Sequence, residues 1–274
     1  MGRRLRKTAK ILLALVFLVS TGLMLHRFLG DQQIENTYQH ALEVAMEAPP
    51  PTQPPAETVP ETQPPVVETL WIPEPVEEDA HMEELAQMDL ASLRQVNEDV
   101  IGWIRIPDTK IDYPFLQGED NEYYLKRTWQ GHKNGAGSIF LECRNSADMT
   151  DFNTILYGHN MKSGAMFAGL RKYTGQSYWE KHPYVYLLTD QGVWRYEIFS
   201  AYKAPVDSYA YGLSFQQRET RENFIASALE NSQIETGVEP AVTDRILTLS
   251  TCSGAGYTTR WVVHARLQMI EVET

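Results

Sequence analysis

The proline-rich segment of residues 49–79 constrains this chain most, because it cannot pack and therefore divides the sequence into separate parts. Ten of the fifteen prolines lie between Pro49 and Pro75, among glutamates and threonines. Proline fixes φ and removes a backbone donor, so the segment favours extended polyproline II. Fully extended, it would reach on the order of 90 Å. We interpret it as a spacer, and the alternatives are a disordered linker or a ligand for proline-binding modules.

Charge separates the same parts of the chain. Residues 1–30 carry six Lys or Arg and no acid, whereas residues 31–93 carry fourteen acids and no Lys or Arg. Residues 94–274 carry 18 basic and 22 acidic residues, so the net charge of −12 belongs mainly to the segment around the prolines. Nothing resembles the basic footprint of a nucleic-acid-binding protein, and no nucleic-acid partner is predicted.

Residues 1–30 predict a membrane anchor. Five basic residues precede an apolar run from Ile11 to Leu29, which is interrupted only near its end by His26 and Arg27. At ~1.5 Å per residue this run spans roughly 28 Å, close to the hydrocarbon thickness of a bilayer. The basic flank is expected to stay in the cytoplasm, which places the rest of the chain outside the cell. The alternatives are a cleaved signal peptide, for which Ser20-Thr-Gly22 is a poor cleavage site, and a buried helix.

Residues 31–80 are therefore predicted to form an acidic, proline-rich extracellular stalk, which could begin with a short helix over residues 31–48. Residues 81–274 are predicted to form one folded domain, and their number is ample for a single core. The helical spacing of apolar residues between Met82 and Val96 indicates one or two short helices at the start of this domain.

Short strands dominate the remainder of the domain. Apolar runs and turn signals predict eight strands: Ile101–Ile106, Ile111–Gln117, Gly137–Glu142, Asn153–His159, Tyr184–Thr189, Val193–Tyr202, Arg245–Thr251 and Arg260–Leu267. A short helix is expected over Met166–Lys172, and a longer one over Phe215–Leu229 with Ser214 as its N-cap. We therefore predict a mainly β fold, a closed or nearly closed barrel decorated with short helices.

The last two strands bring a thiol and a cation together. They can form an antiparallel hairpin, in which Cys252 at the end of one strand lies beside Arg260 at the start of the next. A thiol beside a fixed cation suits a nucleophile whose transition state carries negative charge. The alternative is a buried cysteine next to a surface arginine, and this segment alone does not decide between them.

A cysteine nucleophile needs a base, and two of the seven histidines lie on predicted strands of the domain. His264 lies four residues past Arg260, roughly 13 Å along the strand at ~3.3 Å per residue, so we predict a structural role for it. His159 ends a buried strand and opens into a turn-prone loop, where catalytic groups gather. A satisfied surface histidine is the alternative reading of His159.

The sequence predicts no metal and no cofactor. The cysteines, Cys143 and Cys252, are too few for a disulfide framework, and neither has a Cys or His at zinc-ligand spacing. The acids around Asp148 and Asp151 match no calcium loop. Cys143 is predicted to be a core thiol.

Three motifs of the domain resemble those of a sortase. They are Thr248-Leu-Ser-Thr-Cys252, Arg260-Trp-Val-Val-His264 and Tyr157-Gly-His-Asn160, the last followed by Met166-Phe-Ala-Gly-Leu170. The helix between the sixth and seventh strands is similar to that of class B sortases, as are the segments 102–107, 111–114 and 120–124. The resemblance covers roughly residues 85–272. The stalk is longer than the resemblance leads us to expect.

The resemblance implies an eight-stranded sortase-type barrel and a cysteine transpeptidase on the outer face of a Gram-positive membrane. In that reading Cys252 attacks a backbone carbonyl in the C-terminal sorting motif of an exported protein. His159 protonates the leaving amine, and Arg260 stabilises the oxyanion or holds the substrate. An amine of a peptidoglycan cross-bridge, of its lipid-linked precursor or of another surface protein then resolves the thioester. Class B relatives are associated with Asn-Pro-x-Thr-type signals.

Four further residues are predicted to contact the substrate. Ser250 and Thr251 directly precede the nucleophile, and Ser250 shares the face of Cys252 by the period of a strand. Tyr157 and Asn160 flank His159. All four are therefore candidates to line the groove in which the sorting motif would lie.

Two other functions fit the sequence. A membrane-tethered cysteine protease, a peptidase-type hydrolase, would share the first half-reaction and let water resolve the thioester. A non-enzymatic, wall-spanning binding module would use the anchor and the stalk alone. A peptide assay with and without an amine acceptor separates these three functions.

Overall fold

The computed structural model describes residues 2–47, 79–252 and 258–268. The chain divides into two units, residues 1–40 and 41–274, which are described separately.

The predicted apolar segment and the helix expected over residues 31–48 lie in one helix, α1 (Gly2–Glu47). Across the described ranges, no helix combines the length and apolar character required to cross a membrane. Of the proline-rich segment predicted over residues 49–79, residues 49–78 lie outside the described residues.

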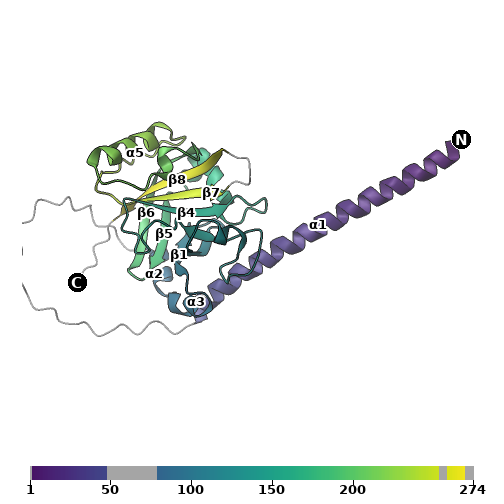
Figure 1. Ribbon diagram of the computed structural model, residues 1–274, viewed down its shortest axis with the longest axis horizontal. Coiled ribbons are helices and arrows are strands. Elements are labelled where there is room, and N and C mark those ends of the chain that lie inside the picture. The colour runs from purple at the N-terminus through teal and green to yellow at the C-terminus, as the bar shows by residue number, and fades with distance from the viewer. Residues whose placement is uncertain (1, 48–78, 253–257, 269–274) are drawn as a thin grey trace, which may run out of the picture. The chain divides into compact units, whose positions relative to one another are not determined.

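The second unit is built on eight strands that close into a barrel (Figure 1). The strands are β1 (Val100–Arg105), β2 (Asp112–Leu116), β3 (Ile139–Leu141), β4 (Asn153–His159), β5 (Tyr184–Thr189), β6 (Gly192–Pro205), β7 (Ile246–Cys252) and β8 (Thr259–Gln268). Their order around the barrel is β1-β2-β3-β4-β7-β8-β6-β5, and β1 pairs with β5 to close it. Two neighbouring pairs, β2 with β3 and β4 with β7, are parallel. The predicted eight-stranded barrel is confirmed.

Short helices connect and cover these strands. They are α2 (Ala80–Ala86), α3 (Leu90–Val96), the 3₁₀ helices η1 (Tyr123–Lys126), η2 (Phe167–Thr174) and η3 (Tyr209–Tyr211), α4 (Gln176–Trp179) and α5 (Arg218–Glu230). Asp79 is the N-cap of α2, and its carboxylate accepts from the N–H groups of His81 and Met82. The helices α2 and α3 agree with the expectation for the start of the domain.

Two predicted helices differ from those observed. The segment expected over Met166–Lys172 is the 3₁₀ helix η2. Helix α5 starts at Arg218 with Gln217 at its N-cap, so the prediction of Ser214 as N-cap is wrong. The cause is packing: the ring of Phe215 lies 4.7 Å from that of Phe152, in the core that α5 closes. Phe215 is partly buried against this core, and its carbonyl accepts from Arg221 Nε at 2.9 Å, so the segment before Arg218 packs as a loop instead of extending the helix.

A hydrophobic cluster lies between α5 and the barrel. Its buried members come from α5, from strands β6, β7 and β8, from the connection around η3 and from the residue before β4: Phe152, Phe199, Tyr202, Ala204, Ala210, Phe224, Ile225, Ala228, Ile246 and Val262. In Figure 1, α5 lies beside β8 at one side of the barrel. This cluster fixes the long β6–β7 connection, which carries η3 toward the end of β7.

His264 is fully buried in this region, as the strand-distance argument predicts for a structural residue. Its Nδ1 lies 2.9 Å from the Thr248 hydroxyl, which donates to Asn153 Oδ1 at 2.6 Å. Because the Thr248 hydroxyl donates its only hydrogen to Asn153, it accepts a hydrogen bond from His264 Nδ1–H. His264 Nε2, at 3.2 Å, then accepts from the Tyr202 hydroxyl. The ring is therefore held neutral, and burial lowers the pKa of His264 to about 3.

We expect this histidine to make the fold sensitive to acid. Its unfolded pKa is 6.5, so below pH ~6.5 the unfolded chain gains a proton that the folded chain excludes. The linked loss of stability is about 1.4 kcal/mol per pH unit between the unfolded and the folded pKa. Urea unfolding of the wild type from pH 7.5 to 4.5 measures this slope. In His264→Gln the change of unfolding free energy with pH should be smaller, by up to the slope that one bound proton gives. Equal slopes in the two proteins would contradict this account, and so would an NMR titration that places the pKa of His264 above 5.

Candidate active site

The ends of β4 and β7 place His159 beside Cys252. These two strands are parallel and paired along their whole length, and the register ends with His159 opposite Cys252. Paired residues of a parallel ladder share one face of the sheet, and neighbouring strands lie about 4.8 Å apart. The structure thus brings together the two positions that the sequence assigned to the nucleophile and to its proton-transfer partner, although they are far apart along the chain.

A backbone carbonyl orients the ring of His159. Its Nε2 lies 2.6 Å from the carbonyl oxygen of Leu125, in η1. A carbonyl oxygen only accepts, so Nε2 carries the hydrogen and donates it. In the neutral ring Nδ1 is then the atom that is able to accept a proton. The tautomer of His159 is therefore set by η1 rather than by a carboxylate.

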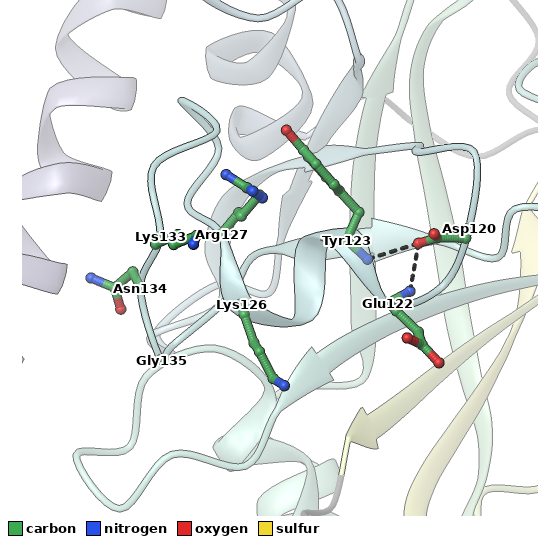
Figure 2. Close-up of a pocket in the computed structure, with 8 residues that line it drawn as sticks. All are labelled: Asp120, Glu122, Tyr123, Lys126, Arg127, Lys133, Asn134 and Gly135. Atoms are coloured by element: carbon green, nitrogen blue, oxygen red, sulfur yellow. Dashed lines mark hydrogen bonds between the residues drawn. The ribbon is translucent and has the colours of Figure 1, made fainter.

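The chain builds η1 around this carbonyl. The Asp120 carboxylate accepts from the N–H groups of Glu122 at 2.9 Å and Tyr123 at 2.8 Å, in the turn that leads into the helix (Figure 2). These hydrogen bonds lower the pKa of Asp120. Gly137 also packs against Leu125: it has φ 61°, and a Cβ at this position would lie 2.7 Å from the Leu125 carbonyl oxygen. Position 137 therefore requires glycine both for its φ and for its close approach to Leu125.

Arg260 reaches the residue that precedes Cys252. Strands β7 and β8 form the predicted hairpin, and the Arg260 guanidinium donates to the carbonyl of Thr251 at 3.4 Å. The adjacent N–H of Trp261 donates to the Thr251 hydroxyl at 3.0 Å. The cation is thus fixed at the end of β7, where a planar donor with several N–H groups can stabilise a developing oxyanion. The middle of the predicted connecting loop, residues 253–257, lies outside the described residues.

The four predicted substrate contacts have different surroundings. Ser250 is fully buried, and its hydroxyl lies 2.9 Å from that of Tyr211 in η3. Thr251 is also buried, with its side chain and carbonyl engaged in the hairpin. Tyr157 is half-buried and donates to Glu142, whereas Asn160 is exposed and bridges to Met166. By position, Tyr157 and Ser250 pair in the same ladder as His159 and Cys252.

Sequence reasoning missed four residues that contact the candidate site residues or hold their partners. Leu125 contributes only its carbonyl, which no side-chain pattern can reveal. Tyr211 lies in a long connection, and Glu142 follows a short strand. Asn121 lies within the segment 120–124, which is similar to class B sortases but gives no sign of this contact. The signal for Glu142 was a single acid at the end of an apolar run.

Cys143 corrects one prediction. It lies in the turn after β3 and is partly exposed, so it is not a core thiol. The buried side chain of this turn is that of Glu142, the residue before Cys143. Burial of the sulfur and the neighbouring Glu142 charge raise the pKa of Cys143, which disfavours a thiolate there.

A cleft of about 670 Å³ opens on the outer side of η1 (Figure 2). It is lined by Asp120, Glu122, Tyr123, Lys126, Arg127, Lys133, Asn134 and Gly135. The guanidinium of Arg127 lies over the ring of Tyr123, 4.5 Å from its centroid. Within the described parts of the chain, no group of three or more His, Cys, Asp or Glu residues is arranged to hold a metal ion.

The chain is similar to known proteins in sequence and in structure. A family model described as a sortase domain matches residues 104–268. Sortase B of Listeria monocytogenes is 40% identical over 164 residues, which cover 60% of this chain and 67% of that protein. Sortase B of Staphylococcus aureus is 36% identical with the same coverage.

Solved structures of sortase B resemble the barrel. The Staphylococcus aureus sortase B–substrate complex has a TM-score of 0.64 and 35% identity, and it covers 66% of this chain and 85% of that one. The structure of sortase B complexed with triglycine has a TM-score of 0.64, 34% identity, and coverages of 66% and 86%. The similarity thus includes structures with a substrate and with a short glycine peptide.

Proposed function

We propose that this chain, which belongs to the sortase family and is a class B member of it, cleaves a C-terminal sorting signal. It then transfers the protein that bore the signal to an amine. As a sortase it is a cysteine transpeptidase. The observation that carries the more specific proposal is the register of β4 and β7, which ends with His159 opposite Cys252, with Arg260 at the preceding carbonyl.

In the first half-reaction the Cys252 thiolate attacks the scissile carbonyl. A C–S bond forms, and the C–N bond of the peptide breaks as His159 gives its proton to the leaving amine. Arg260 supports the negative charge on the carbonyl oxygen of the tetrahedral intermediate. Nδ1 is the ring atom suited to this proton transfer, because Nε2 donates to the Leu125 carbonyl.

In the second half-reaction an amine attacks the thioester. A new C–N bond forms, the C–S bond breaks, and His159 takes the proton of the attacking amine. The substrate complex and the triglycine complex of sortase B support a sorting-motif peptide and an amine-bearing acceptor as partners of this chain. A peptidoglycan cross-bridge amine or its lipid-linked precursor is the acceptor we propose.

We further propose that residues 1–30 anchor the enzyme in the cell membrane, with the N-terminus in the cytoplasm and the catalytic domain outside. The support is the basic flank before an apolar run. Along α1, large apolar side chains from Leu13 to Val19 and from Leu23 to Leu25 are exposed. Protease treatment of intact cells should remove the domain, and protection of the domain would contradict this orientation.

The function is tested with a quenched peptide that contains an Asn-Pro-x-Thr motif, incubated with and without triglycine. We expect cleavage in both samples and a peptide–glycine product where triglycine is present. Cleavage without any such product would favour the protease. An absence of cleavage across a panel of sorting motifs would favour the binding module.

A further inference from the structure

Glu142 is a buried carboxylate outside the Cys–His–Arg set. Its side chain is 1% exposed, in the turn that follows β3. Its oxygens accept from Asn121 Nδ2 at 2.8 Å and from the Tyr157 hydroxyl at 3.0 Å. Arg144 Nε donates to it at 2.7 Å, and the Cys143 thiol lies at 3.7 Å. Four donors thus converge on one carboxylate.

Two of these donors belong to the segments that hold His159. Tyr157 lies two residues before His159 on β4, the strand that carries the imidazole. Asn121 lies in the turn that starts η1, the helix whose Leu125 carbonyl accepts from His159 Nε2. Asn121 also accepts from the Cys143 N–H at 2.9 Å, so both ends of its amide are engaged with the same turn.

The backbone of Glu142 joins the same elements. Its N–H donates to the carbonyl of Ile155 in β4 at 2.9 Å. Its carbonyl accepts from Gln117 Nε2 at 3.1 Å and from the N–H of Asn145 at 2.9 Å. The carboxylate therefore sits at a fixed point between β4 and the approach to η1.

From these contacts we infer that Glu142 is a positioning residue, which joins the strand that carries His159 to the helix that orients the ring. This inference rests on the proposed function of His159 in proton transfer. Position 142 needs a carboxylate because all partners of its side chain are donors. A glutamine there would point its N–H₂ group, itself a donor, at some of them. Burial raises the pKa of Glu142, but the hydrogen bonds from Arg144, Asn121 and Tyr157 outweigh it and hold that pKa below its usual value.

Kinetics of three variants test this role. Misplacement of a catalytic group by about 1 Å costs on the order of 10²-fold in rate, so we expect Glu142→Ala to lose about that much kcat. Glu142→Gln should lose most of it, and Glu142→Asp, which keeps the charge on a shorter side chain, should recover part. Cleavage and transfer should fall together, because His159 serves both half-reactions. Asp148→Asn, an exposed acid nearby in the loop before β4, is the matched control and should keep wild-type kcat.

An NMR measurement separates positioning from mere stability and does not depend on activity. In ¹⁵N-histidine-labelled protein, His159 should give the signature of the Nε2–H tautomer, assigned by its loss in His159→Gln. In Glu142→Ala at a temperature where the protein is folded, the His159 signals should shift toward a mixture of tautomers. An unchanged spectrum, kcat within twofold of wild type, or a kcat loss equal to the unfolded fraction would overturn the inference. If the wild type cleaves no peptide, the proposed function fails while the tautomer test still decides the role of Glu142.

Discussion

Replacement of Cys252 by alanine is expected to abolish peptide cleavage, with a fall in rate of more than about 10⁴-fold. The thioester cannot form without sulfur, and the other cysteine, Cys143, lies in the turn after β3. The backbone of β7 pairs with β4 up to this position through main-chain hydrogen bonds, so removal of one sulfur should leave the fold intact. The measurement is product formation by chromatography, with the thermal unfolding midpoint as the check on folding.

The matched control is Cys143→Ala. Cys143 lies in the turn after β3, and burial together with the Glu142 charge raises its pKa, so it is a poor nucleophile. In the wild type and in Cys143→Ala, iodoacetamide should rapidly label one cysteine, Cys252. Cys252→Ala should resist this rapid labelling. Cleavage by a folded Cys252→Ala protein near the wild-type rate would rule out the thioester mechanism.

The strands could be read from the sequence because their signals are local. Alternation and turn residues fixed each strand to within a few residues, and the hairpin that places Arg260 near Cys252 joins neighbours in sequence. The pairing of β4 with β7 is different, since some ninety residues separate them along the chain. Periodicity says which residues share a face but not which strands are neighbours, so the His159–Cys252 register could not be derived from it.

The features that orient the site were the least predictable. The Leu125 carbonyl is a main-chain atom, and its approach to His159 depends on the turn that Asp120 holds before η1 and on the close contact at Gly137. The start of α5 was missed for the opposite reason. A Ser-x-x-Gln pattern at Ser214 predicted a cap, but the partly buried Phe215 packs against Phe152, and the helix starts at Arg218 instead. Tertiary contacts decide in both cases, and local sequence carries no signal of them.

Replacement of His159 by glutamine is expected to lower kcat by about 10²- to 10⁴-fold, the usual contribution of a general acid–base group. The amide nitrogen of glutamine reaches to where the imidazole Nε2 lies, so it can still donate to the Leu125 carbonyl. Glutamine cannot exchange a proton with sulfur or with an amine. The variant thus keeps the hydrogen bond that positions the side chain at 159 and removes only the chemistry.

The pH profile distinguishes this loss from a loss of structure. In the wild type the rate should pass through a maximum, because cleavage needs a thiolate and a protonated imidazole together. In His159→Gln the acid is missing, so the residual rate should rise with pH as the thiol ionises, without a falling limb. His132→Gln, which changes an exposed histidine in a loop, should keep the wild-type profile. A bell-shaped profile in folded His159→Gln would assign the acid to another residue, because position 159 would then hold no titratable group.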